Sequence, residues 1–215
     1  ASLTNLTFRA NEAASIGGGL CVISVAANDS EAVLPGIGRS IIQISNSSFE
    51  LNEASSGAGL YGFMFASFLL DGCRFHLNSA RSHGGAIALD GEKYQTKAGD
   101  ESVSTFDGEQ AYVQKFHYQA RQSLELPCNP DSDNRIASLT FKVNNSEFVS
   151  NEAFDSGGAV IVVNGCFFWA EHTVFLHNKA TFSGAAYLGQ SLFFCQYCNF
   201  KNNSARGPGG ASIVP

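Results

Sequence analysis

The segment Phe148-Val149-Ser150-Asn151-Glu152-Ala153 decides the fold, because its Phe, Asn and Ala recur at the same spacing along the whole chain. A pair of small residues such as Gly157-Gly158 follows nine and ten positions after the Phe, and a short apolar run comes next. Six units carry this pattern, with Phe8 and Asn11, Phe49 and Asn52, Phe75 and Asn78, Phe148 and Asn151, Phe175 and Asn178, and Phe200 and Asn203. Such self-similarity is the signature of a repeat architecture.

The distance along the chain from one repeated Phe to the next gives the size of the unit. These spacings are 41, 26, 73, 27 and 25. Three of the five are nearly equal, and their common value lies within the range of periods that solenoid repeats use. The two longer spacings predict insertions at about 25–38 and 90–135. Apolar residues also alternate upstream of each Phe, as at Phe141 and Val143 before Phe148. This alternation predicts about three short strands per unit, separated by turns.

A unit this short cannot bury its own apolar face, but stacked units can. Each strand then pairs with its counterpart in the next unit, about 4.8 Å away. We therefore predict an all-β fold: a right-handed parallel β-helix of about six coils, forming a single domain over 1–215. The right-handed sense follows the rule for parallel crossovers. In such a stack each Asn amide donates to the next coil, and the small pair suits a positive φ or a close backbone approach.

The paired motifs F-x-x-N and G-G-A-[ILV] resemble the repeats of the chlamydial polymorphic membrane proteins and of related algal and protist surface proteins. The match is clearest at Phe75 and Asn78 with Gly84-Gly85-Ala86-Ile87, and at the unit of Phe148. The units of Phe8, Phe49 and Phe175 depart from the second motif. The resemblance implies a β-helix in an extracellular or surface setting and, from the chlamydial members, adhesion. It implies no catalytic residues.

Composition excludes several other classes of protein. Charged residues make up 15% of the chain and the net charge is −6, which argues against a nucleic-acid partner. No apolar run reaches the length of about 18 residues that suggests a membrane span. Neither terminal unit carries a polar capping element, and bare solenoid ends aggregate. We therefore expect an excerpt of a longer solenoid, with further coils or other chains at both ends.

The six cysteines leave several interpretations open. Cys195-Gln-Tyr-Cys198 is a C-x-x-C motif, which occurs in structural disulfides, metal sites and redox sites. A zinc site would need a second pair of ligands, and a redox site would need the start of a helix. The sequence shows neither. Cys166 and Cys195 fall one coil apart, so a Cys166–Cys195 disulfide is the candidate bridge. A bridge from Cys128 to Cys73 would tie the long insertion to the coil. Buried free thiols are the alternative.

Five asparagines start N-glycosylation sequons: Asn5, Asn28, Asn46, Asn144 and Asn202. They fall in predicted turns or in an insertion, where a glycan could face solvent. None of the six repeated asparagines starts a sequon. The pattern fits a secreted glycoprotein, while chance in a chain rich in Asn and Ser is the alternative.

The sequence offers little else that points to chemistry. Its histidines lack metal-ligand spacing and are expected at the surface or in turns. Asp131 and Asp133 lack the Gly and Glu of a calcium-binding loop. Glu12, Glu53 and Glu152 each follow a repeated Asn. We expect them to form a row exposed to solvent; the alternative is a catalytic carboxylate site, as in β-helix enzymes. We predict no catalytic residue, cofactor or metal.

The insertion at 90–135 is the largest departure from the repeat. It is polar and carries aromatic residues, and Glu109–Leu126 is a candidate helix. Long loops are usually functional or disordered, so we expect this insertion to contact partners. The alternative is that the insertion only covers one face of a sheet. The sequence thus favours a noncatalytic extracellular structural or adhesive protein with protein, cell-surface or glycan partners. The alternative is a carbohydrate-binding or polysaccharide-cleaving β-helix.

Overall fold

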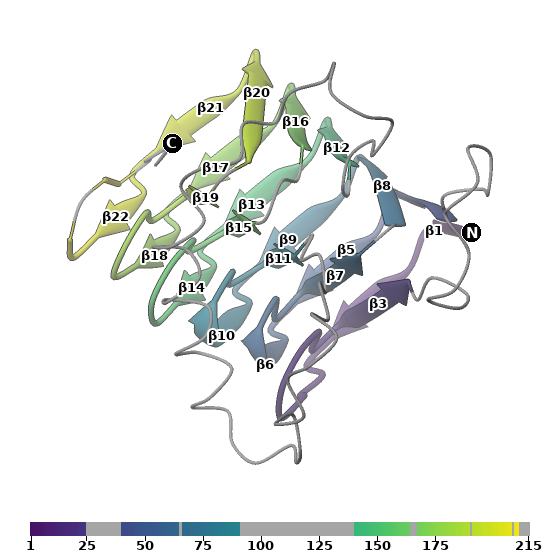
Figure 1. Ribbon diagram of the computed structural model, residues 1–215, viewed down its shortest axis with the longest axis horizontal. Coiled ribbons are helices and arrows are strands. Elements are labelled where there is room, and N and C mark those ends of the chain that lie inside the picture. Colours follow the sequence, from purple (N-terminus) through teal and green to yellow (C-terminus); the bar gives the residue numbers. More distant parts are fainter. Residues whose placement is uncertain are drawn as a thin grey trace, which may run out of the picture.

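The computed structural model describes residues 1–24, 40–64, 66–90, 140–163, 167–189, 191–207 and 209–210, and these residues form a parallel β-helix (Figure 1). Six coils, numbered 1 to 6 in chain order, follow one another along the axis. Apart from Asp90, the two predicted insertions and the candidate helix Glu109–Leu126 lie outside the described residues. The right-handed sense of the coil stays a prediction.

Two of the four sheets come first in each coil and take one strand from all six coils. Sheet A contains β1 (Ser2–Thr4), β4 (Ser40–Ser45), β8 (Ala66–Asp71), β12 (Thr140–Asn144), β16 (Phe167–Glu171) and β20 (Leu192–Gln196). Sheet B contains β2 (Thr7–Arg9), β5 (Ser48–Glu50), β9 (Arg74–His76), β13 (Glu147–Val149), β17 (Val174–Leu176) and β21 (Asn199–Lys201).

The other two sheets complete the coil, and each has five described strands. Sheet C contains β6 (Glu53–Ser56), β10 (Ser79–His83), β14 (Glu152–Ala153), β18 (Lys179–Ala180) and β22 (Ser204–Ala205). Sheet D contains β3 (Leu20–Ser24), β7 (Leu60–Met64), β11 (Ile87–Asp90), β15 (Val160–Val163) and β19 (Ala186–Gly189). Every described pairing between neighbouring coils is parallel, as at β13 and β17.

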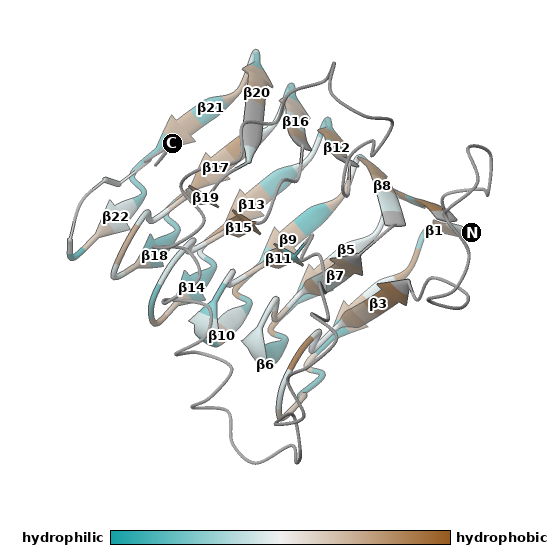
Figure 2. Ribbon diagram, in the orientation of Figure 1, coloured by the Kyte–Doolittle hydropathy of each residue, from teal (hydrophilic) through white to brown (hydrophobic). Residues whose placement is uncertain are grey.

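The prediction of about three strands per coil is wrong, because coils 2 to 5 each hold four. The strand that sequence reasoning missed is the one in sheet C. It is short and mostly polar, as Figure 2 shows for β10, β14 and β18, and its single inward residue is the repeated Ala. Ala54, Ala80 and Ala153 pack together beneath this sheet, so the repeated Ala lies within a strand rather than in a turn.

The interior of the coil is filled by columns of identical or similar side chains. The repeated Phe rings stack face to face along the axis, with centroids 4.6 to 4.9 Å apart. Phe49, Phe75 and Phe148 are fully buried, and burying a side chain of this size contributes about 1.5–3 kcal/mol. Inward residues of sheets A and D pack against the same column. The Phe column therefore runs through the common core of all six coils.

Three corners of each coil turn through a residue in the left-handed region. The A–B corner uses Asn5, Asn46, Gly72, Asn145, His172 and Tyr197, with φ between 46° and 61°. The B–C corner uses Ala10, Leu51, Leu77, Ser150, His177 and Asn202. The C–D corner uses Gly17, Gly57, Gly84, Gly157, Ser183 and Gly209. One residue of this conformation bends the chain from one sheet into the next without a loop, which keeps the coil compact.

The small pair at the C–D corner serves both purposes that the sequence suggested. Gly84 has φ +62°, and a Cβ on its neighbour Gly85 would lie 2.2 Å from the Gly158 carbonyl oxygen. The first position therefore needs a left-handed backbone and the second a close approach between coils. In coils 2 and 5 the left-handed residue comes one position earlier than the repeat suggests, at Gly57 and Ser183.

The fourth junction, from sheet D to the next sheet A, varies in length. It takes one residue between β7 and β8, three between β15 and β16 and two between β19 and β20. It takes fifteen between β3 and β4 and forty-nine between β11 and β12. Both insertions therefore leave the coil at the same junction, which we call the D–A junction.

Sheet D differs from the other sheets on its outer face. Tyr61, Ala88, Ile161 and Val163 occupy outward positions, yet each is at most 5% exposed. Figure 2 shows the sheet D strands as more hydrophobic than those of sheet C. The outer face of sheet D is thus a second apolar layer, beside the junction from which the longer insertion departs at Asp90. Within the described ranges, the chain has no helix that is long and apolar enough to cross a membrane.

Candidate functional site

The repeated asparagines form a continuous ladder inside the B–C corner, which confirms the predicted asparagine column. The Asn78 amide donates to the Asn151 side-chain oxygen in the next coil (2.9 Å) and to the Phe49 carbonyl in the previous coil (2.8 Å). The Asn78 side-chain oxygen accepts from the backbone N–H of Asn52 (3.1 Å). The same pattern links Asn11 to Asn203. Each buried amide is therefore fully used by the scaffold.

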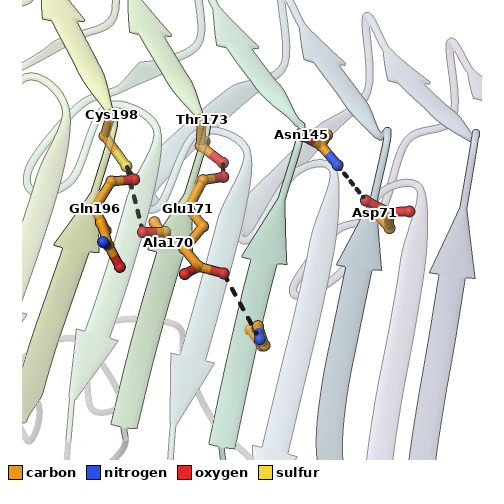
Figure 3. A network of polar contacts seen from close by, with 8 residues as sticks. Asp71, Asn145, Ala170, Glu171, Thr173, Gln196 and Cys198 are labelled. Atoms are coloured by element: carbon orange, nitrogen blue, oxygen red, sulfur yellow. Dashed lines mark hydrogen bonds and ion pairs between the residues drawn. The ribbon is translucent and has the colours of Figure 1, made fainter.

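A second ladder lies at the A–B corner, and sequence reasoning missed it. The side chain two positions before the Phe points inward and donates to the carbonyl two residues earlier, as Thr173 does to Glu171 (2.7 Å, Figure 3). Ser47, Ser146, Cys73 and Cys198 do the same. The available signal was a Ser, Thr or Cys at this place in coils 2 to 6, which the change of residue type hid.

Aromatic and charged side chains line the outer face of sheet A in coils 4 to 6. Lys142, Trp169 and Phe194 stand in one register. The Lys142 ammonium lies 5.5 Å from the Trp169 ring centre, and the Trp169 and Phe194 rings are 4.1 Å apart. At the adjoining corner, His172 stacks on Tyr197 at 4.9 Å. We call these five residues the outer aromatic file. It does not repeat in coils 1 to 3, where Ser2, Gln43 and Leu69 take the place of Trp169.

Polar groups border this file at the A–B corner. Lys142 lies 3.8 Å from a Glu171 carboxylate oxygen, and the Asn145 amide donates to Asp71 at 3.0 Å (Figure 3). Phe194 is 41% exposed and Tyr197 72% exposed. Exposed aromatic rings beside carboxylate and amide groups can bind a ligand that has both apolar faces and hydroxyl groups.

The expectation of surface or turn histidines holds for His172 and His177, which occupy left-handed corners, but it is wrong for His83. His83 is only 7% exposed. Its Nε2 lies 3.2 Å from the Asp155 carboxylate in coil 4, and its Nδ1 lies 2.5 Å from the Ser82 hydroxyl. The cause is its position at the end of β10, where His83 pairs with Ser56 of coil 2 and Ser156 of coil 4 and is enclosed between these coils. Spacing could not reveal this contact because it occurs once and joins different coils.

The Ser82–His83–Asp155 cluster has the residue types of a nucleophilic triad. Ser82 is only 7% exposed, however, so a substrate has no access to its hydroxyl in this structure. Burial, and secondarily the Asp155 charge, raise the pKa of the nearby Tyr187 phenol. The arrangement therefore links coils 3 and 4 through a buried polar contact, and we assign it no chemistry.

The row of glutamates is exposed to solvent. In the backbone ladder of sheet C, Glu12 stands beside Glu53 of the next coil, and Glu152 stands beside Lys179 of the next coil. All four side chains are exposed on the outer face of sheet C, away from the outer aromatic file on sheet A. Their positions therefore favour a row of side chains exposed to solvent over a catalytic carboxylate site.

The described cysteines carry free thiols. Cys195 is one of them, and the Cys166–Cys195 bridge stays a prediction because Cys166 is not among the described residues. The Cys195 side chain points into the coil and packs against the core beside Cys198. Cys73 is buried and donates to the Ile44 carbonyl (3.3 Å), so it acts as a member of the second ladder. Cys166, and Cys128 as the suggested partner of Cys73, lie outside the described residues.

The described sequons arise where the fold itself needs Asn or Ser. Asn5, Asn46 and Asn202 are exposed left-handed corner residues, a conformation that Asn tolerates better than most residues. Asn144 is half-buried and its sequon hydroxyl is Ser146 of the second ladder. The first three sites could hold a glycan without rearrangement. Asn28, like Asp131 and Asp133, lies outside the described residues.

Within the described ranges, no group of three or more His, Cys, Asp or Glu side chains could hold a metal ion. Comparison with protein-family models, with curated proteins and with solved structures finds no match to this chain. The repeated residues are occupied by ladder contacts. The candidate functional surfaces are therefore the parts that do not repeat: the outer aromatic file and the D–A junction.

Proposed function

We propose that this chain is a noncatalytic structural or adhesive segment of an extracellular β-helix protein, and that it contacts partners through the insertions at the D–A junction. The observation that carries the proposal is that both insertions occupy this one junction while the other three corners keep a fixed design. A rigid scaffold that presents variable loops along one edge is suited to recognition.

Two further features support the extracellular setting. The resemblance to surface-protein repeats implies it, and three sequon asparagines are exposed at corners where glycans would point away from the coil. Glycosidase treatment of the protein from a eukaryotic secretory host should lower its intact mass. An unchanged mass would count against the glycoprotein part of the proposal.

Deletion of 91–134 tests the role of the longer insertion. The expected result is loss of assembly or of cell-surface binding, with the far-ultraviolet circular dichroism of the β-helix retained. The control replaces the same residues with a Gly/Ser chain of equal length, which keeps the spacing but removes the side chains. Unaffected binding in both variants would argue that the insertion only covers the coil.

The outer aromatic file favours a second candidate function, carbohydrate binding. Exposed rings stack on the apolar faces of sugars, while Glu171 and Lys142 could bind hydroxyl groups. A glycan array, with Phe194→Ser as the variant and Phe154→Ser at the distant C–D corner as the control, tests this. Phe154 is 72% exposed and Phe194 41% exposed, so the control removes at least as much exposed aromatic surface as the variant. Turnover in a parallel polysaccharide lyase and hydrolase screen would replace the noncatalytic proposal.

A further inference from the structure

Coil 6 brings two thiols into the same corner of the interior. Cys195 is an inward residue of β20, and Cys198 follows the left-handed residue Tyr197 (φ 55°). Because the chain bends there from sheet A into sheet B, both side chains pack against the core. The Cys198 thiol donates to the Ala170 carbonyl at 3.4 Å (Figure 3), and Ala170 is the residue that pairs with Cys195 in the sheet.

The other coils show what these two positions normally hold. The position of Cys195 is occupied by Leu3, Ile44, Leu70, Val143 and Ala170 in coils 1 to 5, and that of Cys198 by Leu6, Ser47, Cys73, Ser146 and Thr173. One position is thus apolar and the other belongs to the second ladder. Coil 6 alone, among these six, has a thiol at both.

We propose that Cys195 and Cys198 are a modification site, at which a disulfide closes the A–B corner of coil 6. A low-molecular-weight disulfide such as oxidised glutathione is the oxidant. One cysteine thiolate attacks it, forms a mixed disulfide and releases the first glutathione thiolate. The second cysteine thiolate then attacks the protein-bound sulfur and releases the second. The two cysteines together lose two electrons and two protons, and one oxidised glutathione becomes two reduced molecules.

The folded coil controls when this reaction occurs. Burial, and then the neighbouring Cys198 thiol, raise the pKa of Cys195, so Cys195 itself supplies little reactive thiolate once coil 6 has packed. We therefore expect the bond to form faster while coil 6 is open, during folding, than after it has packed. After it forms, Cys198 no longer has a proton to donate to Ala170, so the disulfide replaces one contact between coils 5 and 6 with a link inside coil 6.

Cys73 is the internal control for the reaction. It holds the same ladder position in coil 3 and donates to the Ile44 and Asp71 carbonyls. Its neighbour in the apolar position is Leu70, which cannot form a disulfide. Burial raises the pKa of Cys73 as well, so the two sites differ in the presence of a partner thiol rather than in burial.

The test is disulfide mapping of the whole chain refolded in glutathione buffers of increasing oxidising strength. Free thiols are alkylated in denaturant, and the chain is cut with trypsin without reduction. Cleavage at Lys and Arg puts Cys195 and Cys198 alone on the peptide 180–201, Cys73 on 40–74 and Cys166 on 143–179. We expect 180–201 to escape alkylation and to weigh two hydrogens less than its reduced form. The peptide 40–74 should carry an alkyl group.

Two outcomes would overturn the proposal: alkylation of both thiols at every glutathione ratio, or a cross-linked peptide that joins Cys195 to Cys166. The matched variants are Cys198→Ser, which keeps a ladder donor as in Ser146, and Cys195→Ala, which copies Ala170. Each should lose the change in urea midpoint that a reductant causes in the parent chain. The mapping of the parent chain decides the question even if a variant does not fold.

Discussion

Within each coil, the part that contains the three left-handed corners keeps a nearly constant length, whereas the D–A junction varies in length. The stretch from the first residue of sheet A to the last residue of sheet D has nearly the same length in coils 2 to 5, at 40–64, 66–90, 140–163 and 167–189. The D–A junction, by contrast, spans between one and forty-nine residues. Both ladders and the Phe column lie within the constant stretch, so a change of length there would move side chains out of register. The junction carries neither ladder, and its length is free to vary.

The largest predicted effect comes from changing the length of a corner. A single Gly inserted after Leu77 would displace Asn78 from its ladder and turn the side chains of β10 to the opposite face. We expect it to cost at least about 3 kcal/mol in the free energy of unfolding. The same insertion after Gly165, in the D–A junction, should cost no more than about 0.5 kcal/mol, because loop closure depends weakly on length. Urea unfolding followed by circular dichroism measures both, and equal midpoints would contradict the comparison.

Removing one ladder side chain should have the next largest effect. Asn78→Ala leaves the Phe49 carbonyl and the Asn52 N–H without their partners in the interior. Each unsatisfied buried group costs about 1–3 kcal/mol, so we expect a loss of about 3 kcal/mol in the free energy of unfolding. Asn46→Ala, at an exposed corner position outside the ladder, is the control and should cost about 1 kcal/mol. Similar urea midpoints for the two variants would argue against the ladder as a main source of stability.

The sequence predicted the constant part of the molecule well, for a physical reason. Stacking puts the same residue in the same environment six times, so Phe75 and Asn78 stand out by recurrence alone. The lengths between them also located both insertions. The sheet C strand escaped prediction because Ala80 is its only repeated inward residue and its other side chains are polar.

The features that occur once could not be predicted in the same way. The contact between His83 and Asp155 depends on two coils meeting at residues 72 positions apart, and the sequence repeats neither residue at the matching place in the neighbouring coil. The outer aromatic file likewise depends on which residues stand above one another in β16 and β20. The candidate functional residues of the outer aromatic file do not recur from coil to coil, so recurrence, the strongest signal in this sequence, could not identify them.

A third prediction compares two glycines, one at a constant corner and one beside the variable junction. Gly157 has φ +69°, and a Cβ there would lie 2.4 Å from the Val160 carbonyl oxygen. Gly157→Ala should therefore lower the free energy of unfolding by about 2 kcal/mol. Gly189 ends β19, and its added Cβ would lie 3.3 Å from the Val163 side chain and 3.4 Å from the Tyr187 ring, so these side chains must shift slightly. Gly189→Ala should therefore lower the free energy of unfolding by about 1 kcal/mol or less, because side-chain atoms give way more easily than a carbonyl oxygen. Thermal unfolding that ranks the two variants in the opposite order would overturn this reasoning.

The smallest predicted effect concerns the outer face of sheet B, where side chains also link coils but lie in solvent. Arg74 in coil 3 and Glu147 in coil 4 are 2.9 Å apart, and their side chains are 49% and 46% exposed. Solvent screens such a pair, so a double-mutant cycle of Arg74→Gln and Glu147→Gln should give a coupling of about 0.5 kcal/mol or less. The coupling should fall further in 1 M salt, where the Debye length shrinks to about 3 Å and salt ions screen exposed charges strongly. A coupling as large as the loss from Asn78→Ala would mean that outer contacts hold the coils together as strongly as the interior ladders, and the distinction between constant interior and variable exterior would then fail.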